Sequence, residues 1–331
     1  MDRVKIGVVG VGHLGRSHAR LLAEHQDAHL VAVADVNEAA RTAASTTYEV
    51  EAFADYRELA GRVDAVSVVV PTWLHREVAG FFLENGIDVM VEKPITPTLR
   101  EGEELVALAA RKQRILQVGH VERFNAVVRA ILQQGWRPRY VEAERVAPFS
   151  FRSTDIGVVL DLMIHDIDLV LALVDSPLVD VDAHGGAVFT PAEDLASATL
   201  KFANGSAAHL TASRVALKPA RRMRLFSPDG YASLDFQKAH GIVIKKNPGW
   251  ELQKLDLGQV VPGQDLWKFV FEGLLSVQEY KLDTGNPLNE ELSAFLNSVR
   301  TRARPLVGGE DGCAAVGAAE RVLAAIAKNR W

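Results

Sequence analysis

Two side chains of types that move protons lie four residues apart, at Asp161 and His165. An apolar helical pattern covers residues 156–173, and positions i and i+4 of a helix share one face, so the two groups can reach each other. An imidazole accepts a proton near neutral pH, and a neighbouring carboxylate can orient its ring. The spacing therefore makes His165 a candidate general base with Asp161 as its partner. A histidine that only packs within the helix is the alternative that this spacing leaves open.

Lys93 is a third candidate for chemistry. It follows an apolar run at residues 87–91 that is typical of a buried strand, and Pro94 comes directly after it. A lysine that leaves a buried strand and is held by a proline is poorly placed for a solvated face. It is well placed for the cleft at the carboxyl ends of parallel strands, where ligands of open α/β sheets bind.

A glycine pattern predicts what this cleft holds. The pattern G-x-G-x-x-G occupies residues 10–15, directly after an apolar run at residues 4–9. Its first glycine permits a tight turn, its second lets the backbone approach a pyrophosphate, and its third lets helix and strand pack closely. Free N–H groups at the start of the following helix attract phosphate. The pattern therefore predicts a dinucleotide site with contacts at Gly10, Gly12, His13, Leu14 and Gly15.

Asp35 discriminates between two dinucleotides. It ends the second predicted strand, twenty residues after Gly15. A carboxylate there can accept hydrogen bonds from both ribose hydroxyls and repels a 2′-phosphate. The nearest cation in the following sequence is Arg41. We therefore predict NAD as the cofactor, with a turn-capping aspartate as the alternative. Segments after two further strands should reach the same cleft and add the contacts Pro71, Thr72, His75, Glu92 and Lys93.

The first 120 residues alternate strand-like runs with helical patterns. The strand-like runs cover residues 4–9, 29–34, 65–70, 87–91 and 115–118, and helical patterns cover residues 17–24, 57–60, 75–84 and 99–111. Such alternation implies right-handed crossovers and a parallel sheet. We therefore predict a Rossmann domain over residues 1–120.

The pattern changes from residue 139 onward. Strand-like runs separated by turn signals cover residues 140–147, 179–185, 196–202, 207–214, 222–227, 230–235 and 241–245. Helical patterns at residues 289–302 and 311–328 close the chain and can pack back on the first domain. The predicted fold class is α/β, with an N-terminal Rossmann parallel sheet and a C-terminal α+β domain over residues 121–331 that contains a large, mostly antiparallel open sheet. One face of that sheet has no evident cover, so we expect a homo-oligomer formed through it.

Composition limits the possible partners. A net charge of −5 over 331 residues argues against a general nucleic-acid binder. The single cysteine, Cys313, permits no intrachain disulfide and is interpreted as a packing residue. No apolar run approaches the roughly 20 residues that a membrane helix needs. We expect a cytoplasmic protein with no nucleic-acid, membrane or metal partner.

Three segments, in order along the chain, resemble the glucose–fructose oxidoreductase / inositol dehydrogenase / MocA family. They are Glu92-Lys93-Pro94, residues 119–125, and the D-x-x-x-H element from Asp161 to His165. The resemblance covers essentially the whole chain and implies an NAD-dependent dehydrogenase that acts on a CH–OH group. It also implies a cis peptide before Pro94, with Lys93, Asp161 and His165 meeting at the nicotinamide. In that arrangement His165 takes the proton of a substrate hydroxyl, Lys93 hydrogen-bonds its oxygen, and Asp161 orients the network.

Residues 118–125 and 151–168 look closest to a bacterial branch of that family. Its members oxidise the C3 hydroxyl of UDP-N-acetylglucosamine, so that an aminotransferase can install a 3-amino group for lipid A. The resemblance implies substrate contacts at Lys93, Arg123, Asn125, Arg152, Asp161 and His165, with arginines suited to a diphosphate. A further basic run at residues 218–224 is either a solvated strand face or part of that grip.

Other functions stay open from the sequence alone. Residues 157–160 read Gly-Val-Val-Leu where many sugar dehydrogenases of the family carry a Gly-Gly pair, which disfavours simple polyols. A dehydrogenase of a free sugar, inositol or another polyol is nevertheless the second candidate. A non-catalytic NAD-binding sensor is the third. The family forms dimers and tetramers through its second sheet, and we expect one of these states here.

Overall fold

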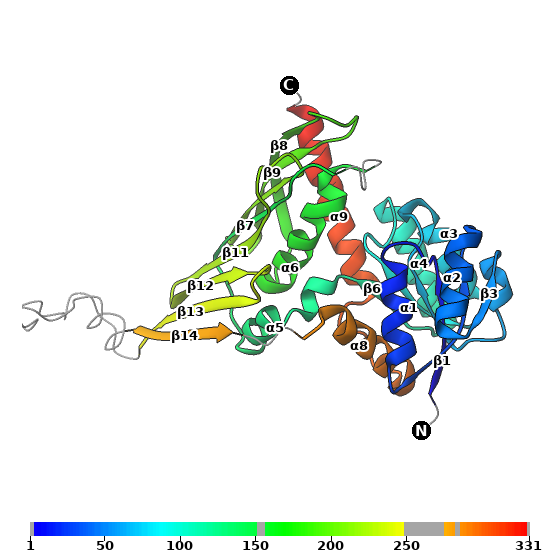
Figure 1. Cartoon of the computed structure of the whole chain (residues 1–331). Helices are drawn as coiled ribbons and strands as arrows, with labels where there is room; N and C mark the ends of the chain where they lie inside the picture. The colour runs from blue at the N-terminus through cyan, green and yellow to red at the C-terminus, as the bar shows by residue number, and fades with distance from the viewer. Residues whose placement is uncertain (1–2, 151–155, 248–274, 282–284, 330–331) are drawn as a thin grey trace, which may run out of the picture. The chain divides into compact units, whose positions relative to one another are not determined.

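The computed structural model describes residues 3–150, 156–247, 275–281 and 285–329 (Figure 1). Its contacts divide the chain into two compact units. The first unit comprises residues 1–124 and 285–321, and the second comprises residues 125–284 and 322–331. Of the helices in the described ranges, none has the length and apolar character needed to cross a membrane.

A parallel sheet of six strands forms the centre of the first unit. Its strands are β1 (Val4–Val9), β2 (Ala28–Ala34), β3 (Glu51–Phe53), β4 (Ala65–Val68), β5 (Asp88–Glu92) and β6 (Leu116–Gly119). They follow the order β3-β2-β1-β4-β5-β6, and all neighbours pair in parallel. Every residue of β4 and β5 is buried, as expected for parallel strands covered on both faces. This order is that of a dinucleotide-binding Rossmann sheet, in which the strand order reverses beside β1.

Helices from both ends of the chain pack on this sheet. They are α1 (Gly15–Glu24), α2 (Glu38–Tyr48), α3 (His75–Glu84), α4 (Leu99–Lys112), α8 (Pro287–Thr301) and the first part of α9 (Gly309–Lys328). The α8 residues Leu292, Phe295 and Leu296 are buried in one apolar cluster with Ile6 of β1 and Leu30 of β2. A segment distant in sequence therefore completes the core of the first unit.

The second unit is built on an eight-stranded sheet. Its strands are β7 (Tyr140–Val146), β8 (Leu178–Gly186), β9 (Leu195–Phe202), β10 (Ala207–Ser213), β11 (Ala220–Ser227), β12 (Gly230–Asp235), β13 (His240–Lys246) and β14 (Leu275–Lys281). The order is β14-β13-β12-β11-β7-β10-β9-β8. β7 and β10 pair in parallel, whereas the other neighbours pair antiparallel. The sheet is therefore mixed but predominantly antiparallel.

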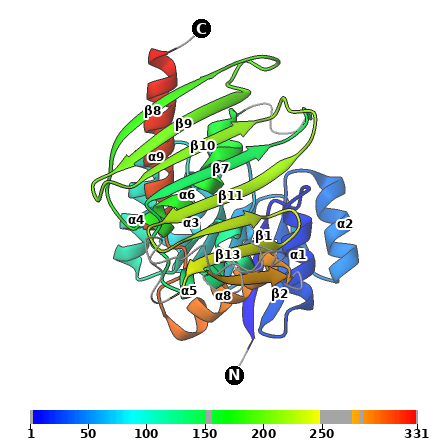
Figure 2. The ribbon, with the colours of Figure 1, turned by 90° about the vertical axis from the view of Figure 1, so that its left-hand side faces the viewer.

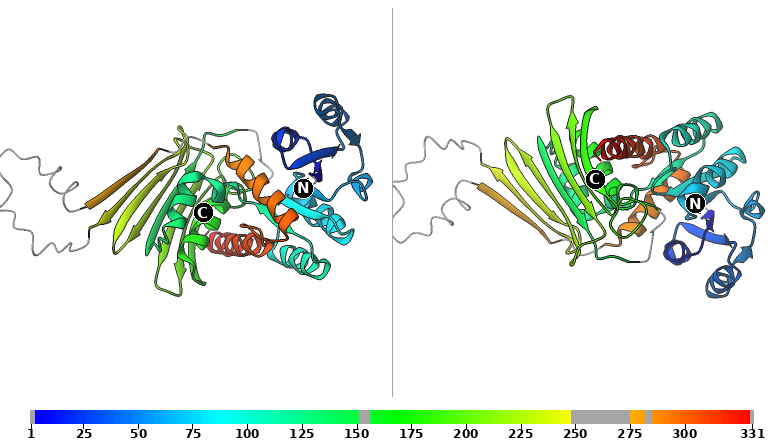
Figure 3. Two further views of the ribbon diagram at one scale, coloured as in Figure 1. Left: turned by 90° about the horizontal axis from the view of Figure 1, so that it is seen from below. Right: turned by 90° about the horizontal axis from the view of Figure 1, so that it is seen from above.

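Helices cover one face of the eight-stranded sheet, which we call the inner face. On that face α6 (Ile164–Val174) contacts β7 and β10, and α5 (Ala126–Gln133) packs where Gly241 of β13 leaves room for Val127. The end of α9 reaches β8, where the Asn329 side chain donates to the Ala183 carbonyl at 3.0 Å. Figure 2 views the sheet from the opposite, outer face, and Figure 3 views it along its edge. Within the described part of the second unit, no helix covers the outer face.

The predicted fold class is confirmed, and each predicted strand lies within two residues of an observed one. Sequence reasoning missed α2, α5, β3 and β14. Ala44 is the one residue of α2 that is fully buried, so this helix has no apolar stripe to detect, and β3 has three residues. The predicted helix at residues 57–60 is a 3₁₀ turn, Tyr56–Leu59. Cys313 is buried, and burial raises the pKa of its thiol to about 11.

Candidate active site

The glycine-rich turn between β1 and α1 leaves one position open. A Cβ on Gly10 would lie 2.4 Å from the Val69 carbonyl oxygen, and a Cβ on Gly15 would lie 1.8 Å from the Gly10 carbonyl oxygen. Both glycines are therefore needed for close packing of the turn. A Cβ on Gly12 would meet no atom within 4 Å. The missing side chain at Gly12 thus leaves open space that a pyrophosphate can approach.

Asp35 follows β2 and turns its carboxylate toward this glycine-rich turn. Its Oδ2 accepts the Val11 N–H at 2.8 Å, and its Oδ1 accepts the Asn37 N–H at 2.8 Å. Each carboxylate oxygen keeps capacity for a further hydrogen bond, so ribose hydroxyls can still bind there. Arg41 Nη1 donates to the carbonyl oxygens of Asp35 and Val36 at 3.3 and 3.1 Å. The nearest cation is therefore held by the backbone beside the carboxylate.

Three large apolar side chains are exposed near the carboxyl ends of β1, β2 and β4. The exposed fractions are 47% for Leu14, 90% for Val36 and 68% for Trp73. Thr72 and Trp73 belong to a 3₁₀ turn that runs from Thr72 to Leu74, and Pro71 directly precedes it. Exposed apolar side chains at a ligand edge can cover flat rings. Together with the open position at Gly12 and the carboxylate of Asp35, they fit NAD as the cofactor.

Lys93 begins the turn that follows β5, and both of its neighbours are held. The carboxylate of the buried Glu92 accepts the Lys93 N–H at 3.2 Å through Oε2. The Pro94 carbonyl oxygen lies 2.8 Å from Nδ1 of His75. The Lys93–Pro94 peptide is cis, as the family resemblance implied. Lys93 itself is half-buried.

Asp161 and His165 lie on one helical segment of the second unit, and both are half-buried. Asp161 belongs to a π-helical turn, Val159–Met163, and His165 belongs to the first turn of α6. The prediction of one regular helix over residues 156–173 is corrected by this turn. Single π-helical turns are rare and occur frequently at functional sites.

A buried ion pair anchors the segment that carries His165. Arg145 of β7 donates from Nε and Nη2 to the two carboxylate oxygens of Asp166, at 3.0 and 2.9 Å. The two side chains are 4% and 3% exposed. Such a bidentate pair fixes direction as well as distance. Because Asp166 is adjacent to His165, the pair holds the first turn of α6 against the sheet.

Asp161 has a buried guanidinium as a neighbour. Arg214 Nη2 lies 3.9 Å from Asp161 Oδ2 and donates to the Ile156 carbonyl at 2.7 Å. Its Nε lies 3.9 Å from Oδ1 of Asp194. The Arg214 side chain is 6% exposed, so its charge is weakly screened. Sequence reasoning missed Arg214, because no spacing or motif connects the residue after β10 with residue 161.

The other predicted substrate residues lie in separate surroundings. Arg123 is 8% exposed, and its Nη2 lies 3.8 Å from Asp311 Oδ1. The Asn125 side chain caps α5 by accepting the Val127 N–H at 3.0 Å. Arg152 lies outside the described residues. None of these positions therefore tests the predicted substrate contacts.

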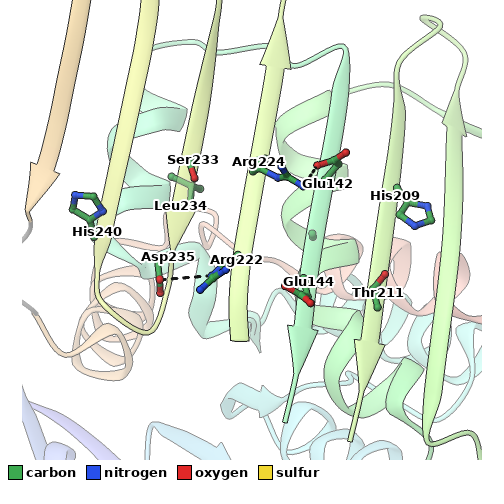
Figure 4. A pocket seen from close by; sticks show the side chains of 11 residues that line it. Glu142, Glu144, His209, Thr211, Arg222, Arg224, Ser233, Leu234, Asp235 and His240 are labelled. Atoms are coloured by element: carbon green, nitrogen blue, oxygen red, sulfur yellow. Dashed lines mark ion pairs between the residues drawn. The ribbon is translucent and has the colours of Figure 1, made fainter. Parts of the chain in front are cut away.

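The basic run at residues 218–224 places two arginines on the outer face of the eight-stranded sheet. They line a hollow of about 620 Å³ there (Figure 4). Arg224 pairs with Glu142, and Arg222 Nε lies 3.9 Å from Asp235 Oδ2. Because carboxylates balance both guanidiniums, the contacts favour a strand-face role for this run over a grip on a diphosphate.

The candidate site residues fall in two groups. Lys93 and the predicted cofactor contacts belong to the first unit, whereas Asp161 and His165 belong to the second. The meeting of Lys93 with the other two at the nicotinamide therefore stays a prediction. Across the described ranges, no group of three or more histidine, cysteine, aspartate or glutamate side chains is arranged to hold a metal ion.

Two family models match consecutive parts of the chain. The model described as "Oxidoreductase family, NAD-binding Rossmann fold" matches residues 4–120, and the model described as "GFO/IDH/MocA C-terminal domain" matches residues 120–233. The first range contains the six-stranded sheet, and the second contains β7 to β11 and most of β12, whereas β13 and β14 lie beyond it.

Similar proteins include sugar-nucleotide and polyol dehydrogenases. UDP-N-acetylglucosamine 3-dehydrogenase from Acidithiobacillus ferrooxidans is 43% identical over 237 residues, which cover 71% of this chain and 75% of that protein. A solved structure of that enzyme matches with a TM-score of 0.87 and 36% identity, and the match covers 98% of each chain. Inositol 2-dehydrogenase from Rhizobium meliloti is 25% identical, and the match covers 99% of this chain and 98% of that protein.

Proposed function

The chain belongs to the GFO/IDH/MocA oxidoreductase family, and we propose that it oxidises the C3 hydroxyl of UDP-N-acetylglucosamine with NAD. The observation that carries this proposal is the 43% identity with UDP-N-acetylglucosamine 3-dehydrogenase, against 25% with inositol 2-dehydrogenase. The 3-keto product would serve an aminotransferase that makes a 3-amino sugar for lipid A. The same proposal has two further parts. Residues 1–120 bind the cofactor and residues 121–331 bind the substrate, and the protein is located in the cytoplasm.

The first unit holds the cofactor in this mechanism. The open backbone at Gly12 would hold the pyrophosphate, and the Asp35 carboxylate would accept hydrogen bonds from the ribose hydroxyls. The exposed side chains of Leu14, Val36 and Trp73 would pack on the rings. When bound, NAD supplies the hydride acceptor.

Proton transfer from the substrate falls to the other group of residues. His165 accepts the proton of the C3 hydroxyl as the hydride leaves the same carbon, and a ketone forms. Asp161 orients the imidazole, and the buried Arg214 guanidinium lies 3.9 Å from that carboxylate. Lys93 donates a hydrogen bond to the reacting oxygen. The buried Arg145–Asp166 pair supports this role, because a general base contributes only when its direction is fixed.

The test is formation of reduced nicotinamide, followed by absorbance, with a panel of UDP-sugars, free sugars and inositol. A ketone trap, or an aminotransferase with its amino donor, is included to pull the reaction forward. We expect turnover with UDP-N-acetylglucosamine and at least a hundredfold loss in Lys93→Met and in His165→Asn, as general acid–base groups typically contribute about that much. Turnover with inositol or a free sugar alone would overturn the substrate assignment. Inositol is the second candidate because of the full-length match to inositol 2-dehydrogenase.

The proposal includes self-association of the chain through the outer face of the eight-stranded sheet. Tyr140, Phe226 and Tyr231 form an aromatic row on that face, with ring centroids 5.8 and 5.1 Å apart. Guanidiniums and carboxylates alternate beside this row, so a second copy related by a twofold axis can match opposite charges. We expect light scattering to give the molecular mass of a dimer or tetramer for the wild-type protein. We expect Arg224→Glu to shift the measured mass of the assembly toward that of a monomer. A monomeric wild-type protein would refute this part of the proposal.

A further inference from the structure

Two buried histidines flank the turn that carries Lys93, and the proposed mechanism uses neither of them. His18, in α1, is 0% exposed, and His75, at the start of α3, is 1% exposed. His18 follows the glycine-rich turn after β1, and His75 follows the segment after β4. Both segments are predicted to bind the cofactor, and β1 and β4 are the two strands that precede β5 in the order of the sheet. Neither ring can serve a substrate in bulk solvent. Their role must therefore pass through the groups that they touch.

His18 contacts the carboxylate that holds the Lys93 backbone. Its Nε2 lies 3.2 Å from Glu92 Oε1, and its Nδ1 lies 2.9 Å from Ser67 Oγ in β4. The other oxygen of Glu92 accepts the Lys93 N–H at 3.2 Å. Burial raises the pKa of Glu92, but contact with His18 and the charge of Lys93 outweigh it and hold the pKa below its usual value. The carboxylate is therefore ionised, and it connects His18 to Lys93.

β6 also limits the position of the Glu92 carboxylate. A Cβ on Gly119 would lie 2.9 Å from Glu92 Oε1. Glycine at this position leaves the carboxylate the space that it occupies between His18 and β6. Gly119 begins the segment 119–125, which resembles the family, and this contact is a physical reason for a glycine at its first position.

His75 contacts the other side of the same turn. Its Nδ1 lies 2.8 Å from the Pro94 carbonyl oxygen, and its Nε2 lies 2.9 Å from the Val70 carbonyl oxygen. Burial lowers the pKa of His75, which keeps the ring neutral at neutral pH. In its neutral form the imidazole has one N–H, so one nitrogen donates to one of these carbonyl oxygens while the other nitrogen only lies against the second. Both nitrogens face backbone carbonyl oxygens of the protein.

We propose that His18 and His75 are positioning residues for Lys93, which hold Glu92 and Pro94 on its two sides so that the ammonium group meets the substrate oxygen in one fixed direction. The inference rests on the proposed function, in which Lys93 contacts the substrate. Lysine has a flexible four-carbon stem, so the direction of its charge depends on a fixed backbone. A misplacement of about 1 Å at a reacting group can cost about a hundredfold in rate.

The test combines turnover with exchange of a single amide. His18→Leu and His75→Leu remove both nitrogens, whereas His18→Gln and His75→Asn each retain a polar group in the side chain. His25→Leu is the matched control, because His25 is a partly buried histidine of the same unit whose Nε2 lies 2.9 Å from Ser293 Oγ, away from the turn. We expect both leucine variants to lower kcat about tenfold to a hundredfold. The KM for NAD should stay within about threefold, and the polar variants should recover part of the loss.

A double-mutant cycle separates positioning from general damage. In the Lys93→Met background, His18→Leu and His75→Leu should each cost less than about threefold further, because the group they position is gone. Losses that multiply fully with that of Lys93→Met would overturn the inference. A loss confined to NAD affinity would overturn it as well.

Hydrogen exchange of the Lys93 amide gives a readout that needs no substrate. We expect at least about tenfold faster exchange in His18→Leu and in His75→Leu than in His25→Leu. Unchanged exchange would overturn the inference. If the wild-type protein turned over no compound of the panel, the proposed function would fail, while the exchange of this amide would still decide whether the histidines hold the turn.

Discussion

Replacement of Arg145 by methionine is expected to loosen the helix that carries the candidate base. The guanidinium makes two hydrogen bonds to Asp166, at 3.0 and 2.9 Å, and both side chains are nearly inaccessible. Methionine has a similar length but no charge, so Arg145→Met leaves a carboxylate in the interior with its guanidinium partner removed. The variant therefore tests whether this pair fixes α6.

The magnitude follows from burial. Removal of one partner of a buried ion pair costs about 3–5 kcal/mol, because the other charge is left without compensation. A second pair, Arg137 with Asp175 at the end of α6, has a distance of 3.3 Å and side chains 57% and 70% exposed. Exposed pairs contribute about 0–1 kcal/mol. Arg137→Met is therefore a control at an exposed ion pair, which joins the segment before β7 to the end of the same helix.

Hydrogen exchange measured by mass spectrometry on peptides from β7 and α6 reads this difference locally. A loss of 3 kcal/mol corresponds to roughly a hundredfold faster exchange, since about 1.4 kcal/mol is a factor of ten. We expect Arg145→Met to reach that change and Arg137→Met to stay within about fivefold. The double variant Arg145→Met, Asp166→Leu should recover most of the protection, because an apolar pair has no charge to leave unpaired. Equal effects of the two arginine variants would refute the reasoning.

Three further predictions concern single residues. Asp35→Ser should lower kcat/KM for NAD about tenfold or more and raise kcat/KM for NADP, because a charged hydrogen-bond acceptor is lost beside Arg41. An unchanged ratio of the two kcat/KM values would contradict the role of Asp35. Arg214→Met should lower turnover about tenfold while the Kd for NAD, measured by fluorescence, stays constant; an equal loss in the exposed control Arg137→Met would contradict this. Burial raises the pKa of Asp194, but hydrogen bonds from the 188–190 backbone and the Thr190 hydroxyl outweigh it and hold that pKa at about 2. Because this folded-state pKa lies below the ordinary 3.8, the stabilisation is present above pH 4 and is lost as the pH falls toward 2; thermal unfolding of Asp194→Asn should therefore lack this part of the acid dependence.

Features that depend on neighbours in sequence could be predicted. The glycine-rich turn, Asp35 and the alternating strands are local patterns, because each is set by a short run of side chains around one backbone path. The three glycines behave as their pattern requires, with Gly10 and Gly15 closely packed and Gly12 open. The parallel pairing of these strands followed from the alternation of strands and helices, whereas their order is known only from the structure.

Features that depend on contacts across the fold could not be predicted. The Ser67 hydroxyl lies 49 residues from His18, and Asp166 lies 21 residues from Arg145. No periodicity relates such positions, and only the packed structure shows which polar side chains share a buried space. The same limit applies to the π-helical turn at Asp161, since π and α turns have nearly the same apolar pattern.

The free energy of unfolding does not by itself explain why polar groups are buried around the candidate site. A buried ion pair contributes little net free energy compared with apolar side chains of the same volume, and single unpaired replacements are costly. Apolar residues at the positions of His18 and Arg145 would therefore be compatible with a stable fold. Apolar contacts, however, have no direction, whereas a charge-assisted hydrogen bond fixes an angle as well as a distance. Lys93 and His165 each adjoin such a direction-fixing contact, through Glu92 and Asp166. We therefore infer that these groups serve catalytic geometry, and that replacement of both partners of a pair by apolar residues, as in Arg145→Met, Asp166→Leu, will lower turnover while it leaves the free energy of unfolding nearly unchanged.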